Sequence, residues 1–137
     1  MSPLAILKLY LATTAVFLAV DLLWVGMVAN PFYQARLGSF LAPEVKWGAA
    51  LLFYLLFVVG ILVFAALPAL ATGSAAKAAL LGALLGLVAY AAFDLTCLAL
   101  FRDFPLAVAV VDLAWGTTVS AAVAAAAYGI GVRLGLG

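Results

Sequence analysis

Four long apolar runs divide this chain, and each is long enough to cross a lipid bilayer as a helix. They cover about residues 4–29, 46–66, 75–101 and 105–132. A membrane-spanning helix needs about 20 predominantly apolar residues. The sequence therefore predicts an all-α, polytopic integral membrane protein, folded as a four-transmembrane-helix bundle that makes residues 1–137 a single transmembrane domain.

The composition requires a bilayer as the solvent and excludes several kinds of partner. Hydrophobic residues make up 71% of the chain and charged residues only 8%, whereas soluble domains are about half apolar and about 25% charged. The net charge of +1 gives no electrostatic basis for binding nucleic acid. Cys97 is the single cysteine and histidine is absent, so we expect no disulfide, no metal and no cofactor.

Local signals predict where the helices begin and end. Asn30-Pro31 should end the first helix, because proline disfavours helical geometry in the preceding residue. Ala42-Pro43-Glu44 resembles the start of the second helix. Pro68–Ala76 is expected to be a linker in which Ser74 caps the third helix. Arg102–Pro105 should form a tight hairpin turn between the third and fourth helices.

Small residues indicate two places where helices approach closely. Gly82 and Gly86 have the small-xxx-small spacing of membrane helix interfaces. Residues 121–127 are mostly alanine and should pack against another helix, in this chain or in a second copy. A homo-oligomer is therefore among the partners to consider, beside the lipid bilayer itself.

Each apolar run contains one polar side chain at a similar distance from the same membrane face. At about 1.5 Å per residue, Asp21 lies roughly 12 Å from the expected end of the first helix, and Asp94 and Asp112 lie roughly 10 Å from theirs. Tyr54 of the second helix reaches the same level. With alternating helix directions, the four side chains are predicted to form one polar layer.

The cost of these acids indicates a function. An acid at the centre of a membrane helix costs about 2.5–3.5 kcal/mol on insertion scales, which is more than the ~0.6–2 kcal/mol that an interhelical polar bond returns. Three carboxylates in one low-dielectric layer cannot all stay ionised, so protons, a cation or an arginine must intervene. The alternative is that the acids only join helices, through Thr96, Thr117, Tyr54 or Tyr90.

Other side chains extend the candidate ligand- and proton-binding site around these acids. Trp24 and Trp115 follow Asp21 and Asp112 by three residues, on the same helical faces. Trp24 could instead be an interfacial anchor, whereas Trp115 could donate its indole N–H to a carboxylate. The full candidate set is Asp21, Asp94, Asp112, Tyr54, Trp24, Trp115, Arg102, Tyr90 and Thr96.

Several membrane chemistries do not fit these residues. Di-iron oxygenases need histidine clusters, and aspartate-rich prenyl transferases need several acids on one helix. An intramembrane aspartyl protease needs a Gly-x-Gly-Asp sequence, which is missing. A retinal protein needs a lysine in mid-membrane, and every lysine here lies near the end of an apolar run.

Two runs resemble the bacterial membrane family known as domain of unknown function 2177. They are YLATTAVFLAVDLLWVGMVANPFY and YAAFDLTCLALFRDFPLAVAVVDLAWGTTVSA, and the resemblance covers nearly the whole chain. The most specific pattern is D-L-T-x-x-A-x-x-R-x-x-P followed by V-D-x-x-W-G. The family usually has asparagine at the position of Cys97. The resemblance implies a small polytopic protein of the bacterial cytoplasmic (inner) membrane and no settled activity.

The leading hypothesis is a proton-linked binding or transport site for a small polar, cationic or lipid-headgroup ligand. A membrane-lipid-modifying enzyme, with one carboxylate as general base, and a structural or accessory subunit are the alternatives. Lys8, Lys77 and Arg133 fall on one side of the membrane, and Arg36, Lys46 and Arg102 on the other. The terminal amine favours both termini in the cytoplasm.

Overall fold

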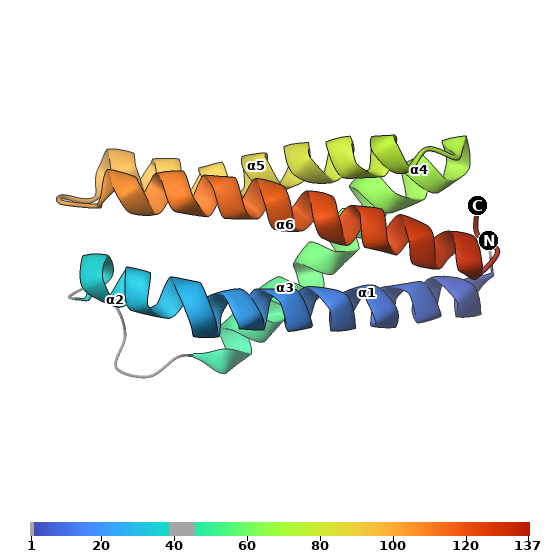
Figure 1. Ribbon diagram of the computed structural model, residues 1–137, viewed down its shortest axis with the longest axis horizontal. Coiled ribbons are helices and arrows are strands. Elements are labelled where there is room, and N and C mark those ends of the chain that lie inside the picture. The colour runs from blue at the N-terminus through green and yellow to red at the C-terminus, as the bar shows by residue number, and fades with distance from the viewer. Residues whose placement is uncertain (1, 39–45) are drawn as a thin grey trace.

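The computed structural model describes residues 2–38 and 46–137, and within them the chain is helical with no strand (Figure 1). The elements are α1 (Pro3–Trp24), a π-helix η1 (Val25–Ala29), α2 (Asn30–Leu37), α3 (Trp47–Ile61), a second π-helix η2 (Leu62–Ala66), α4 (Leu67–Thr72), α5 (Ala75–Leu100) and α6 (Leu106–Arg133).

Four of the described helical segments are long and apolar enough to cross a membrane. They are Pro3–Met27, Trp47–Thr72, Ala75–Leu100 and Leu106–Arg133. The two chain ends lie at the same end of the bundle, and α3 crosses the other helices obliquely (Figure 1). The prediction of an all-α polytopic bundle is confirmed.

Two prolines that were expected to end helices instead lie inside them. Pro31 is the second residue of α2 and Pro68 is the second residue of α4, and a π-helix directly precedes each. Proline lacks an N–H donor and its ring clashes with the carbonyl four residues earlier. The wider π turn, in which the N–H of Asn30 bonds to the Val25 carbonyl, relieves this clash. The prediction that Asn30-Pro31 ends the first helix is therefore wrong, and so is the linker beginning at Pro68.

Other predicted boundaries agree with the structure where it describes them. The Ser74 hydroxyl caps α5 by accepting from the backbone N–H of Lys77 at 3.1 Å. The turn between α5 and α6 places Asp103 in the left-handed region, with φ at 61°. The expected helix start at residues 42–44 lies outside the described residues, and α3 begins at Trp47.

Glycines allow α5 and α6 to pack side by side along most of their length. A Cβ atom added at Gly82 would lie 2.6 Å from Ala124 Cβ, and one at Gly86 would overlap the Gly116 carbonyl oxygen. Ala124 and Ala127 are fully buried inside the chain. The small-residue segments predicted to pack closely therefore meet each other within this chain.

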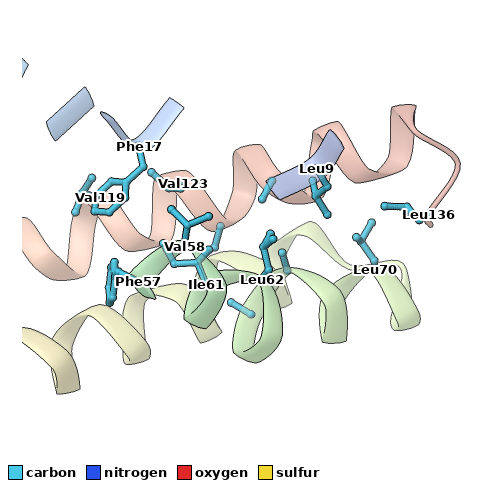
Figure 2. Close-up of a cluster of buried hydrophobic side chains, with 14 residues drawn as sticks. Leu9, Phe17, Phe57, Val58, Ile61, Leu62, Leu70, Val119, Val123 and Leu136 are labelled. Carbon is cyan, nitrogen blue, oxygen red and sulfur yellow. The ribbon is translucent and has the colours of Figure 1, made fainter. Parts of the chain in front are cut away.

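The apolar core lies between α1, α3, η2 and α6, toward the end that carries the termini. Phe17 of α1, Val58 of α3 and Val123 of α6 meet there (Figure 2). Each of these side chains is almost fully buried. The core anchors one half of the bundle, and the three membrane carboxylates occupy the other half.

We expect Gly86→Ala to lower the free energy of unfolding by about 1–3 kcal/mol, because the methyl group overlaps the backbone of α6. The matched control is Gly129→Ala, since a Cβ at Gly129 meets nothing within 4 Å and should leave stability unchanged or raise it by up to about 1 kcal/mol. Unfolding in mixed micelles with an increasing fraction of dodecyl sulfate measures both. Equal effects of the two substitutions would contradict the close approach at Gly86.

Candidate ligand-binding cavity

A cavity of about 430 Å³ lies between the helices in the half of the bundle away from the termini. This volume lies within the range of small-molecule sites. Its walls come from every membrane-crossing segment and from α2. The lining residues are Asp21, Trp24, Val25, Tyr33, Ala50, Phe53, Tyr54, Ala89, Tyr90, Phe93, Asp94, Asp112 and Trp115.

Asp21 joins three helices through its two carboxylate oxygens. The Tyr54 hydroxyl of α3 donates to Oδ2 at 2.6 Å, and the Trp115 indole N–H of α6 donates to Oδ1 at 3.0 Å. Asp21 itself is buried on α1. The predicted indole donor is therefore present, and its acceptor is the acid of the first helix.

The Trp24 ring of α1 and the Trp115 ring of α6 stack face to face. Their ring centroids are 4.2 Å apart and the planes differ by only 6°. Asp21 bonds to Trp115, which lies one turn after Asp112 along α6, so the four polar groups span more than one level around the cavity.

Asp112 is bound by Tyr33, which is not among the nine predicted side chains. The Tyr33 hydroxyl of α2 donates to Asp112 Oδ1. The prediction that Asn30-Pro31 ends the first helix leaves Tyr33 outside the helices that surround the site. The missed signal was that proline is well tolerated in the first turn of a helix, so the helical path could continue to Tyr33.

Asp94 differs from the other two carboxylates. Its side chain is only 1% exposed, and neither carboxylate oxygen has a hydrogen-bond partner among the described residues. Asp94 nevertheless lines the cavity, one turn after Tyr90. The Tyr90 ring packs directly over Gly116 of α6, which holds this part of α5 in place.

Two members of the predicted site lie outside the cavity. Thr96 follows Asp94 by two residues, which turns it to the other side of α5, where it is exposed. Arg102 lies exposed in the turn after α5. Neither is among the lining residues, so the structure brings together seven of the nine predicted side chains, which are Asp21, Asp94, Asp112, Tyr54, Trp24, Trp115 and Tyr90.

The chemistry of the lining is anionic and aromatic. Three aspartates and seven aromatic residues line the cavity, and no lysine or arginine is among the described lining residues. Aromatic faces beside carboxylates attract organic cations, above all ammonium groups that water solvates weakly. In the described part of the chain, no three acidic, histidine or cysteine side chains lie close enough to hold a metal ion.

Comparison with known proteins identifies one relationship. The family model described as "Predicted membrane protein (DUF2177)" matches residues 6–129. No curated protein and no solved structure matches the chain.

We expect Tyr54→Phe to lower the free energy of unfolding by about 1–3 kcal/mol, because Asp21 Oδ2 loses its donor inside the bundle. Tyr10→Phe is the matched control. Tyr10 donates to the Leu55 backbone carbonyl at an exposed position, and its loss should cost about 0.5 kcal/mol. Thermal unfolding in detergent compares the two variants. A loss at Tyr10 as large as the loss at Tyr54 would contradict the role assigned to Asp21.

Proposed function

Because this chain belongs to the family of predicted membrane proteins with domain of unknown function 2177, whose name carries no activity, we propose its function from the cavity. The cavity binds a small ligand that carries a positively charged organic ammonium group. Binding is linked to protonation of the carboxylates, and the use of the site is carriage or transport of the ligand.

The observation that carries this proposal is the state of Asp94. Hydrogen bonds from neighbouring helices account for Asp21 and Asp112, so these two acids fit a structural role. Asp94 is buried without a partner among the described residues. An unpaired buried carboxylate costs several kcal/mol, and a ligand cation would remove that cost.

The aromatic walls support an ammonium group over a metal ion or an anion. Trp24, Trp115 and Tyr90 come from three different helices and line the same cavity as Asp94. Ring faces contribute about 0.5–2 kcal/mol each to binding an organic cation. An anion would meet three carboxylates and no basic side chain in the described lining.

Protons and the ligand cation compete for the same carboxylate in this mechanism. Without a ligand, Asp94 avoids an unpaired charge in the low-dielectric interior by holding a proton. A bound ammonium group replaces that proton. Ligand affinity therefore falls as the pH is lowered, and each binding event releases protons to the solvent.

We further propose that the protein resides in the bacterial cytoplasmic membrane with both termini in the cytoplasm. Lys8, Lys77 and Arg133 lie near helix ends on the side of the bundle that carries the termini. Counting the terminal amine with them favours this orientation under the positive-inside rule. The cavity then lies nearer the outer face.

A second candidate is an enzyme that acts on a membrane lipid. One observation favours it: the cavity reaches the three carboxylates, and its lining includes Phe53 and Phe93, which are exposed on the outer surface of the bundle. In this alternative Asp94, which has no partner in the described chain, is the general base. Turnover of an ammonium-bearing lipid by the purified protein would separate this candidate from simple binding.

We expect Asp94→Asn to weaken binding of alkyl-trimethylammonium ions by about tenfold to a hundredfold, because it removes the charge that pairs with the ammonium group. Calorimetric titration of the purified protein, with short-chain and long-chain ions, measures the affinity. The same titration in two buffers of different ionisation enthalpy counts the protons released.

The matched control is Asp103→Asn. Asp103 lies exposed in the turn between α5 and α6, with a positive φ that asparagine also adopts, and the substitution should leave affinity unchanged. Equal binding by wild type and Asp94→Asn would refute the assignment of Asp94. Failure of the wild type to bind either kind of ion would refute the proposed function.

A further inference from the structure

The cavity has a border that faces the lipid side of the bundle. Phe93 of α5 and Phe53 of α3 both line the cavity, yet they are 62% and 43% exposed. Outward-facing neighbours on these helices, such as Leu52 and Leu95, are also apolar and exposed. In a membrane-spanning bundle such exposed apolar surface contacts acyl chains.

The path of α3 explains why this border exists. α5 packs closely on η2 but only slightly on α3, because α3 crosses the bundle obliquely and its first turns lie away from α5 (Figure 1). The two helices are therefore close near the core and separate toward the cavity. Residues of both helices line the cavity at this border, and we call the border formed by Ala50, Phe53, Ala89 and Phe93 the mouth.

Each helix presents one alanine and one phenylalanine to this mouth. Ala50 and Phe53 are three residues apart on α3, and Ala89 and Phe93 are four residues apart on α5, so each pair lies on one helical face. The alanines leave space between the helices, and the phenylalanines supply apolar walls. A chain of methylene groups fits this lining better than a hydrated ion does.

Resting on the proposed function, we infer that the ligand is an amphiphile that lies partly in the bilayer. Its ammonium group reaches Asp94 inside the cavity, and its hydrocarbon chain leaves through the mouth formed by Ala50, Phe53, Ala89 and Phe93. The recognised chemistry is a cationic headgroup with an attached alkyl or acyl chain. A free soluble ammonium ion shares the headgroup chemistry but leaves the mouth empty.

The test compares two probes that share a headgroup. The protein is placed in phosphatidylglycerol nanodiscs and titrated with tetramethylammonium or with dodecyltrimethylammonium. It carries Trp47→Phe as a background substitution, so that the fluorescence comes from Trp24 and Trp115 and reports on the cavity. Dodecyl maltoside supplies the same chain on a neutral headgroup. We expect the long-chain cation to bind at least about tenfold more tightly than tetramethylammonium.

Substitutions at the mouth distinguish the chain from the headgroup. Ala50→Leu and Ala89→Leu should weaken binding of the long-chain cation about tenfold and change tetramethylammonium binding less than about twofold. Ala49→Leu and Ala92→Leu are matched controls, because both alanines are exposed on the same helices and do not line the cavity. These controls should bind both probes as the wild type does.

The outcomes separate this inference from the proposed function. The inference of an amphiphilic ligand is overturned if both cations bind with equal affinity, if Ala50→Leu and Ala89→Leu leave that affinity unchanged, and if Asp94→Asn abolishes binding. The proposed ammonium site would still hold in that case. The inference of a cationic headgroup is overturned if dodecyl maltoside binds as tightly as the long-chain cation and if Asp94→Asn does not change its affinity. No binding of any cation would overturn the proposed function itself.

Discussion

The hydrogen bonds to the Asp21 carboxylate hold together the half of the bundle that lies away from the termini. Tyr54 of α3 and Trp115 of α6 each donate to one oxygen, so the carboxylate joins α1, α3 and α6. A charged or polar group in hydrocarbon must find partners within the protein, because no water is present to replace them. This requirement fixes the relative rotation of the three helices and turns their polar faces toward one cavity.

The remaining helix is positioned by steric rather than polar contacts. α5 lies against α6 through glycines, and the ring of Tyr90 fits over Gly116. The α5–α6 pair therefore brings Asp94 to the cavity without any hydrogen bond to its carboxylate in the described chain. Close packing contributes dispersion energy that offsets the cost of holding this acid in a low-dielectric site.

The two π-helical segments, η1 and η2, influence the shape of the site by changing the path of the backbone. Each precedes a proline and lets the helical path continue, η1 into α2 and η2 into α4. Through η1, α2 carries Tyr33 to Asp112. The membrane segment Trp47–Thr72 packs on α5 through η2 and α4, whereas α3, its first half, diverges from α5. Local widening at a proline is a common feature of functional helices in membranes.

The sequence by itself determined the bundle class, the close approach at Gly82 and Gly86, and most side chains around the cavity. These follow from apolar run length, from small-residue spacing and from the cost of an acid in hydrocarbon, all of which are local properties. Tertiary structure alone decided that Asp21 bonds to Trp115, that Tyr33 binds Asp112 and that Asp94 lacks a partner in the described chain. Partner choice depends on helix rotation and on continuation past Pro31, and a residue count along separate helices contains neither quantity.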